Sequence, residues 1–456
     1  MKNSKRQLSW FQVDDTNAIA AHLEKMEASG WRLSGIDNWF YSYSRAEPAK
    51  VRYAVTFFPD ASVYDPKITE GQETYADYCQ AAGWELAAAY GPFQCFRSAR
   101  LDAAPIETDE AVKLRAIRRT MRKTFVLSYV LLLVLPAIYL PIMLSTARRD
   151  PFDFFSQNYQ LATLALMIGI VLFAGGFLLD YLVWVLRSVY AVRNGGVCAK
   201  PHTKARLWAS WAMMALCAAV VAAFITGSQD KVFFIIYLLA YGGVMATARW
   251  VLRWLKRSGR SRAGIRGWYF LFAIGAGVAV VVITVLLIPL TDLFRPEAAE
   301  TYTYTNGNFS WTRDVWHDEL PLTLEDLGYA VSADDHCTYR AVKQSSPLAA
   351  KYEYQNEPLN IDSQLPDLRY TVLETKWPWL LEKEWSALTG GGEDAWPIEA
   401  IDPAPWGALE AYKETDVSSY YLRCPERVVI VFLSNGDSME PWQVETIAVA
   451  LAMRSE

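Results

Sequence analysis

Five apolar segments in the middle of the chain constrain its fold more than any other feature. They occupy residues 125–145, 161–185, 208–226, 232–248 and 268–290. Each has roughly 17 to 25 residues with almost no charge, the length that an α-helix needs to cross about 30 Å of hydrocarbon. Buried helices of soluble proteins seldom run so far without a polar face. The sequence therefore predicts a multi-domain integral membrane protein with a five-helix transmembrane bundle.

The linkers between these segments predict an orientation. Basic residues gather before the first segment, between the second and third, and between the fourth and fifth. They are Lys113, Arg115, Arg118, Arg119, Arg122, Lys123, Arg187, Arg193, Lys200, Lys204, Arg206, Arg249, Arg253, Lys256, Arg257, Arg260, Arg262 and Arg266. Because positive loops stay in the cytoplasm, we expect a multi-pass cell-membrane protein with its N-terminus in the cytoplasm and its C-terminus outside.

Polar sequence flanks the apolar segments on both sides. We expect a cytoplasmic domain at residues 1–110 and a basic juxtamembrane segment at 111–124. An extracytoplasmic domain of mixed helices and strands is expected at 296–456. The last region holds about 28 acidic and 11 basic residues, while the whole chain has a net charge of only -5. The start of the chain has no apolar core typical of a cleavable signal, so the first span is expected to direct insertion. We expect the basic segment to bind lipid headgroups of the bilayer, not nucleic acid.

An internal repeat is visible in the first 110 residues. LEKMEASGWRL at 23–33 aligns with ADYCQAAGWEL at 76–86, which is an offset of 53 residues. The same offset pairs Phe40 with Phe93 and Tyr43 with Phe96. An offset that persists beyond the first match indicates duplicated structure.

Each repeat has the pattern strand, helix, strand, strand. The first is expected at 8–13, 16–29, 31–36 and 40–43, and the second at 51–58, 70–82, 85–90 and 93–96. Asp15 or Thr16 would cap the first helix and Gly30 would end it. We expect an α+β domain in which both repeats share one antiparallel sheet, with both helices on one face. Trp31 and Trp84 are interpreted as core anchors, with stacking on a ligand as the alternative.

Several motifs in this region occur in an order that is similar to a known family. They are LSWFQVDD at 8–15, SGWRL at 29–33, FYSYSR at 40–45, YAVTFFP at 53–59 and AGWEL at 82–86. The first quarter of the chain thereby resembles the bacterial membrane-protein family catalogued as domain of unknown function 2812. The resemblance implies transmembrane helices after this domain and a cytoplasmic protein partner in a circuit with a PadR-type regulator. It implies no activity, cofactor or catalytic residue.

Asp180 is the one acidic residue clearly within a predicted span. Acidic residues inside a membrane are costly and often carry ions or protons, so Asp180 is a possible intramembrane functional acid. The alternative is a structural carboxylate, near the interface, that pairs with a neighbouring helix.

Cys337 and Cys424 are the two cysteines of the predicted outer domain, and they could form a disulfide there. Two unpaired thiols are the alternative. Cys79 and Cys95 would face the reducing cytoplasm as ordinary thiols. The run Asp334, Asp335, His336 and Cys337 suggests a metal site, but adjacent side chains cannot easily all reach one ion. We expect a solvated acidic loop there, without a metal.

The sequence contains none of the common motifs for nucleophilic catalysis, zinc hydrolysis, phosphate cradling or dinucleotide binding. We therefore predict no enzyme and no cofactor. The preferred hypothesis is a membrane-anchored sensory or interaction protein that links an unknown extracytoplasmic ligand or partner to a cytoplasmic partner. One alternative is a transporter, or a transporter accessory subunit, that uses Asp180. Another is an envelope enzyme, which would need either a clustered set of acidic residues or His317 and His336 to converge in a pocket of the outer domain.

Overall fold

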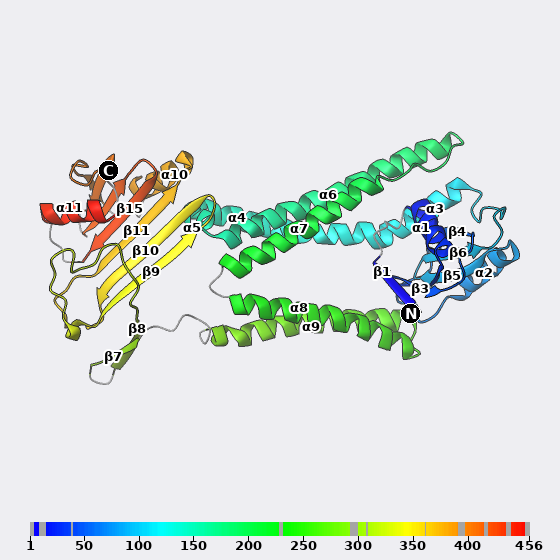
Figure 1. The fold of residues 1–456 in the computed structure, drawn as a ribbon, viewed down its shortest axis with the longest axis horizontal. Coiled ribbons are helices and arrows are strands. Elements are labelled where there is room, and N and C mark those ends of the chain that lie inside the picture. The colour runs from blue at the N-terminus through cyan, green and yellow to red at the C-terminus, as the bar shows by residue number, and fades with distance from the viewer. Residues whose placement is uncertain are drawn as a thin grey trace. The chain divides into compact units, whose positions relative to one another are not determined.

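The structure is a computed structural model that describes residues 4–8, 15–37, 40–227, 231–291, 300–306, 309–360, 362–390, 397–414, 418–434 and 439–451 (Figure 1). The chain divides into two compact units, each described here by itself. Unit 1 comprises Met1–Tyr139, Ala165–Ala219 and Val232–Leu290. Unit 2 comprises Leu140–Leu164, Val220–Lys231 and Thr291–Glu456.

The N-terminal domain, within unit 1, contains both predicted repeats. Its elements are β1 (Ser4–Leu8), α1 (Thr16–Ala28), β2 (Trp31–Ile36), β3 (Phe40–Arg45), β4 (Arg52–Phe57), α2 (Glu70–Ala81), β5 (Glu85–Tyr90) and β6 (Phe93–Ser98). Asp15 caps α1 by accepting a hydrogen bond from the Ala18 amide at 3.2 Å. The strand predicted at 8–13 falls almost entirely outside the described residues. The other predicted strands and helices of both repeats are present.

The duplication extends to the hydrogen-bond register. The strand orders are β1-β3-β2 and β4-β6-β5, so the two repeats have the same topology. Leu33 pairs with Tyr43 and, 53 residues later, Leu86 pairs with Phe96. Each ladder then has an irregularity at the same place, directly after Leu33 and Leu86. A shared bulge at the sequence offset is the signature of one structural unit used twice.

Two details of the predicted domain are wrong. The repeats form two separate three-stranded sheets, with β2 and β5 close together but not in one ladder. The edge strands β2 and β5 both contain the bulge, and a bulge disrupts strand pairing. The helices also cover opposite faces of the second sheet, since Tyr53, Val55 and Phe57 join the core around α1 while Ala54 packs in the core around α2. Alternate residues of a strand point to opposite faces, so β4 contributes to both cores.

Gly30 illustrates how the repeat ends its helix. Its φ is +81°, and a Cβ there would lie 3.1 Å from the Ala46 carbonyl oxygen. We expect Gly30→Ala to destabilise the N-terminal domain by about 1–2 kcal/mol, the cost of a left-handed conformation for a residue with a Cβ. Chemical denaturation, with hydrogen exchange of residues 16–28 as the probe, measures this loss of stability. Gly35→Ala is the control, because its Cβ would meet only Ser42 Cβ at 3.9 Å; equal losses in both variants would contradict the explanation.

A series of long helices follows the N-terminal domain. They are α3 (Glu110–Met121), α4 (Leu127–Arg149), α5 (Pro151–Ser156), α6 (Asn158–Arg193), α7 (Thr203–Gly227), α8 (Lys231–Arg257) and α9 (Arg262–Thr291), with a π-helical turn at Arg122–Val126 between α3 and α4. In the described residues, three helical stretches are long and apolar enough to cross a membrane: Glu110–Arg149, Asn158–Arg193 and Thr203–Ile225. These contain the first three predicted spans.

The predicted count of five spans is not supported by this structure. The segments 232–248 and 268–290 fall in α8 and α9, where many side chains lie outside the described part of the chain. By length and composition, the three helical stretches are compatible with a membrane protein. Gly169 of α6 allows a close approach to α7, because a Cβ there would clash with the side chain of Leu216.

The C-terminal domain, within unit 2, is built on a seven-stranded antiparallel sheet. A hairpin of β7 (Glu300–Asn306) and β8 (Phe309–Val315) precedes it; the sheet and its helices are β9 (Cys337–Ser345), β10 (Ala349–Pro358), β11 (Leu368–Thr375), α10 (Pro378–Thr389), β12 (Ile398–Ala400), β13 (Glu410–Glu414), β14 (Ser419–Arg423), β15 (Arg427–Leu433) and α11 (Pro441–Ala450). The strand order is β12-β13-β14-β15-β11-β10-β9. One face packs against α11 and the other against α10 and α5, which confirms a sheet-rich C-terminal region.

The predicted disulfide is absent. Cys337 and Cys424 are separate buried thiols. Cys337 begins β9 and Cys424 follows β14, and three strands lie between these two in the sheet. Strands are spaced about 4.8 Å apart, so the two residues are separated by roughly 19 Å across the sheet. A disulfide requires Cα atoms within about 7 Å.

Candidate functional site

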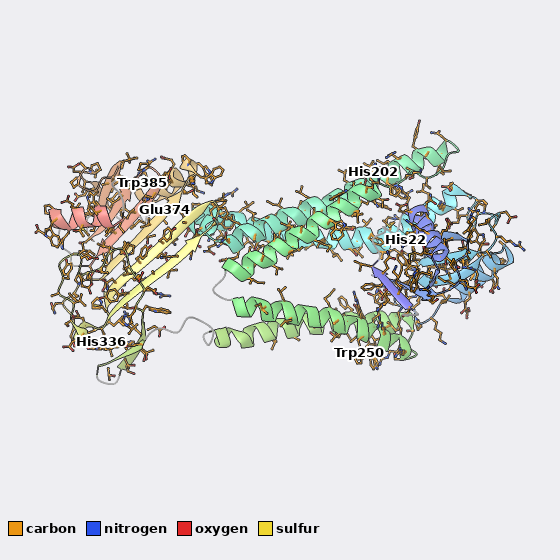
Figure 2. All side chains as sticks on the ribbon, in the orientation of Figure 1. His22, His202, Trp250, His336, Glu374 and Trp385 are labelled. Carbon is orange, nitrogen blue, oxygen red and sulfur yellow. The ribbon has the colours of Figure 1, made fainter. Side chains whose placement is uncertain are left out.

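Asp180 lies on α6 and is held by two side chains from the start of α7. Its carboxylate accepts hydrogen bonds from His202 Nδ1 at 2.7 Å and from Arg206 Nε at 2.5 Å. His202 directly precedes α7 and Arg206 lies in its first turn, four residues later, so both can reach the same carboxylate. His202 is placed beside α6 at this position (Figure 2). The structure therefore favours the paired carboxylate over a free intramembrane acid.

Arg206 is the buried member of this cluster. Only 4% of its side chain is exposed, and its guanidinium lies 5.8 Å from the centre of the Phe177 ring. A small apolar pocket lies against the Arg206 side chain. The pocket is lined by Met121, Phe125, Val126, Tyr129, Phe177, Leu178, Tyr181 and Arg206. A cation in such surroundings needs a compensating charge, and Asp180 supplies it.

The two ring nitrogens of His202 have different neighbours. Arg187 Nη1 lies 3.4 Å from His202 Nε2. A guanidinium can only donate hydrogen bonds and a carboxylate can only accept them. This pattern assigns the proton to Nδ1, which donates to Asp180, and leaves Nε2 as the acceptor from Arg187. Arg206, with Nε 2.5 Å from the carboxylate, is the guanidinium that neutralises Asp180.

The loop that joins α6 to α7 is fixed to the helices around it. Trp184 Nε1 donates to the Ala199 carbonyl oxygen at 2.7 Å, and Ser188 Oγ accepts from the Ala199 amide at 3.1 Å. The Cys198 amide donates to the carboxylate of Glu110, at the start of α3, at 3.0 Å. These bonds hold His202 in place for Asp180, since His202 is the last residue of the loop.

Asp15 connects this cluster to the N-terminal domain. One of its carboxylate oxygens caps α1, and the other accepts a hydrogen bond from Thr203 Oγ1 at the start of α7. Thr203 is adjacent in sequence to His202. One carboxylate thus joins the first turn of α1 to the first turn of α7.

The core of the N-terminal domain is completed by residues from outside that domain. Trp184 and Val185 of α6 and Leu114, Ile117 and Met121 of α3 are buried together with the apolar residues of α1, β3 and β4. Trp184 is only 3% exposed. We name this set, together with Asp15, Asp180, His202, Thr203 and Arg206, the junction. At the junction, α6 is part of the hydrophobic core of the N-terminal domain.

Helix α9 and the basic juxtamembrane segment also contact the N-terminal domain. Arg262 forms an ion pair with Asp65 and donates to the Asp60 carbonyl oxygen at 2.9 Å. Arg119 Nη2 lies 2.8 Å from the Asp60 carboxylate, and Lys123 Nζ donates to the Pro59 carbonyl oxygen at 3.3 Å. Some of the basic residues expected to bind lipid headgroups therefore contact the protein itself.

Glu27 is a buried carboxylate that the sequence interpretation missed. It has no exposed side-chain surface and lies 2.7 Å from Arg97 Nη2. Tyr53 Oη donates to it at 2.6 Å, and Arg32 Nε donates at 3.2 Å. Burial alone would raise the pKa of Glu27, but the hydrogen bonds from Arg97 and Tyr53 outweigh it and hold the pKa below its usual value.

The position of Glu27 could have been found from helix periodicity. Ile19, Leu23 and Glu27 follow each other at intervals of four residues, so they share the buried face of α1. Two of its partners, Tyr53 and Arg97, could not be found in this way, because they belong to the second repeat. Glu27 therefore joins the two repeats through one charged network.

The predicted acidic loop of the C-terminal domain has structural contacts of its own. Asp335 accepts hydrogen bonds from Ser332 Oγ at 2.7 Å and Ser363 Oγ at 2.6 Å. His336 stacks on Tyr302 with ring centres 4.3 Å apart, whereas His317 lies beside Tyr339 at 6.4 Å. The two histidines thus contact different aromatic rings. Across the described residues, no group of three or more His, Cys, Asp or Glu side chains is placed to hold a metal ion.

A polar groove is present elsewhere in the C-terminal domain. It lies at the ends of β10, β11 and β15, on the turn that connects β9 to β10. It is lined by Ser346, Pro347, Leu348, Ala349, Ala350, Glu374, Thr375, Lys376, Glu426 and Arg427. Glu374 (Figure 2) lies 3.4 Å from Arg427, so charges of both signs border the groove.

We expect Asp180→Asn to loosen the α6–α7 loop by about 1.5–3 kcal/mol, because Arg206 loses its charged hydrogen-bond acceptor. Hydrogen exchange at residues 194–202 of the full chain measures the change. Arg193→Gln is the control, since it removes an exposed charge from the same end of α6. The double variant Asp180→Asn/Arg206→Gln should be less perturbed than the sum of its single variants, because it leaves no buried charge unpaired. A purely additive result would show that the two residues are not coupled.

Comparison with known proteins identifies the N-terminal domain. Residues 15–129 match a family described as "Protein of unknown function (DUF2812)". The match includes Asp15, Glu27 and all of α3, and it ends before Asp180. No curated protein and no solved structure matches the chain. The comparisons therefore confirm the resemblance of the N-terminal region and assign no activity.

Proposed function

Because residues 15–129 are a DUF2812 domain attached to helices long enough to cross a membrane, we propose that this protein is a membrane-anchored sensory or interaction protein. In this function the C-terminal domain meets an extracytoplasmic ligand or partner. The N-terminal domain binds a cytoplasmic protein, for which a PadR-type regulator circuit is the candidate. The mechanism needs contact and movement, and requires no catalytic residue.

The observation that carries the proposal is the pair of contacts made by α6. At its first residue, Asn158 Nδ2 donates to the Ser345 carbonyl oxygen of the C-terminal domain at 2.9 Å. Near its other end, Trp184 and Val185 are buried in the core of the N-terminal domain. A helix is stiff along its axis, so a rotation or shift imposed at Asn158 is felt at Trp184. A coupling element of this kind is what a transmembrane sensor requires.

The proposed topology places the N-terminus in the cytoplasm and the C-terminus outside, with α8 and α9 as the fourth and fifth spans. The basic residues near the N-terminal domain support this orientation. The acidic composition of residues 296–456 agrees with it, because the anionic lipids of the inner leaflet repel an acidic domain.

A cytoplasmic partner has an available surface in the second repeat. Ile68, Tyr78 and Leu101 are exposed there, and Tyr78 lies on α2 with 74% of its surface open. Exposed apolar side chains of this size can take part in protein contacts. This surface does not overlap the junction, which involves α1 and α3.

The topology is tested with single cysteines introduced at exposed positions, because the native Cys337 and Cys424 are buried. Thr74→Cys lies on α2 and Ser386→Cys on α10, and both side chains are exposed. We expect a membrane-impermeant maleimide to label Ser386→Cys on intact cells and to label Thr74→Cys only after lysis. Labelling of Thr74→Cys on intact cells would invert the topology.

The sensory function itself is tested by deletion. We expect two deletion variants, one without residues 300–456 and one without residues 15–109, to alter the cell's response. The measured quantities are transcription of the partner circuit and the envelope-stress response. Restoring the full chain should reverse the change. Normal transcription and stress responses in both deletions would refute the proposed function.

A further inference from the structure

The start of α10 exposes an unusual amount of aromatic surface. Lys376, Trp377, Pro378 and Trp379 are four consecutive exposed residues, and the two tryptophans are 48% and 52% exposed. The next residues of the helix, Leu380 and Leu381, are buried against the sheet. Tryptophan is strongly buried on average in proteins, so two adjacent exposed tryptophans indicate a contact surface.

The position of this surface is fixed by α5. Phe155 of α5 meets Trp379 edge to face, with ring centres 5.7 Å apart. Phe152 of α5 is buried with Leu380 and Trp385 of α10. Figure 1 shows α5 and α10 next to each other on one side of the C-terminal sheet. Trp377 and Trp379 are therefore located beside α5.

Helix α5 is itself tied to the membrane surface. It occupies Pro151–Ser156 between α4, which ends at Arg149, and α6, which begins at Asn158. Both neighbours belong to stretches that are long and apolar enough to cross a membrane. A connector this short between two spanning helices has to lie at the water–lipid interface. Arg148 and Arg149, at the same level, are exposed and can meet lipid phosphates.

We propose that Trp377 and Trp379 insert into the interfacial layer of the bilayer, so that the C-terminal domain binds the lipid surface beside α5. Indole rings favour this layer because they have an apolar body and an N–H donor. Lys376 adds a positive charge at headgroup level. The inference rests on the proposed membrane crossing of α4 and α6. It gives the C-terminal domain a second attachment, which would fix its angle to the membrane and to the first turn of α6.

The test uses the purified full chain in liposomes that contain nitroxide-labelled lipids. An environment-sensitive fluorophore is attached at Lys383→Cys, an exposed position one turn after Trp379 on α10, in a background with Cys198→Ala and Cys217→Ala. We expect the lipid nitroxides to quench this fluorophore. Adding Trp377→Ser and Trp379→Ser should abolish most of the quenching.

Two reference positions make the result decisive. Trp442→Ser removes an equally exposed tryptophan from α11, on the other face of the sheet, and should leave the quenching at position 383 unchanged. A fluorophore at Leu135→Cys in α4 should be strongly quenched if α4 crosses the bilayer. Quenching at 135 without quenching at 383 would overturn the lipid contact and keep the crossing. Absence of quenching at 135 would refute the crossing and the lipid contact together.

Discussion

Replacing Glu27 by alanine is expected to destabilise the N-terminal domain by about 3–5 kcal/mol, the cost of removing one partner from a buried ion pair. Arg97, only 14% exposed, would lose its main counter-charge. Tyr53 Oη would lose its acceptor at the same time. The loss would be measured by denaturation of the full chain, with hydrogen exchange over 16–28 and 93–98 to locate it.

The repeat offers a matched control for this variant. Gln80 is the residue that corresponds to Glu27 at the offset of 53, and it is exposed on α2. Gln80→Ala should change the stability by less than about 0.5 kcal/mol, as is usual for surface substitutions. Similar losses at both positions would mean that the helix, and not the charged network, determines the effect.

The same network predicts a pH dependence. The pKa of Glu27 is lowered in the folded protein, chiefly because the hydrogen bonds from Arg97 and Tyr53 exceed the cost of burial. A carboxyl group with a lowered pKa stabilises the fold above its unfolded pKa, near 4.5, and the contribution is lost as pH falls through the folded pKa. The N-terminal domain should therefore lose stability below about pH 4.5. Glu27→Gln should show a flatter profile there, and an unchanged slope would contradict the assignment.

Trp184→Ala is the second substitution with a large expected effect. Truncating a fully buried tryptophan typically costs about 3–5 kcal/mol, because the cavity collapses only partly. Here the variant also removes the hydrogen bond to the Ala199 carbonyl oxygen. We expect faster hydrogen exchange both in the α6–α7 loop and in α1, because Trp184 contributes to both environments. Mass spectrometry of peptides that cover residues 16–28 and 194–202 measures the exchange rates.

Leu186→Ala is the matched control for Trp184, since it lies two residues further along α6 and is 61% exposed. It should leave both peptides unchanged. If Trp184→Ala accelerated exchange only in the α6–α7 loop, α6 would not be part of the N-terminal core in solution, and the coupling proposed for this helix would lose its basis.

The repeat of the N-terminal domain was predictable because each unit is built from local signals. Asp15 and Thr69 cap helices within a few residues of their own position, and Gly30 and Gly83 end them with a positive φ. The arrangement of the two units was not predictable. It depends on which edge strands meet, and the bulges in β2 and β5 are properties of backbone pairing that the side-chain pattern does not encode.

Of the candidate site, only Asp180 was predictable from the sequence, because it too is a local signal. An acidic residue in an apolar segment is visible in the sequence, but its partners depend on the path of residues 194–202, which bring His202 and Arg206 back to α6. The Cys337–Cys424 prediction was wrong because compartment and cysteine count say nothing about strand order. The distance between β9 and β14 is decided by the insertion of β15, β11 and β10 between them.

The most direct test of the central claim, that α6 couples the two domains, starts from Phe152. This residue of α5 is 1% exposed and is buried in the C-terminal domain. Phe152→Ala in the full chain should accelerate hydrogen exchange in α5 and, through α6, in peptides 16–28 and 110–121 of unit 1. Leu409→Ala, at an exposed site of the C-terminal domain, should do neither. Faster exchange in α5 with unchanged exchange in 16–28 and 110–121 would contradict the coupling.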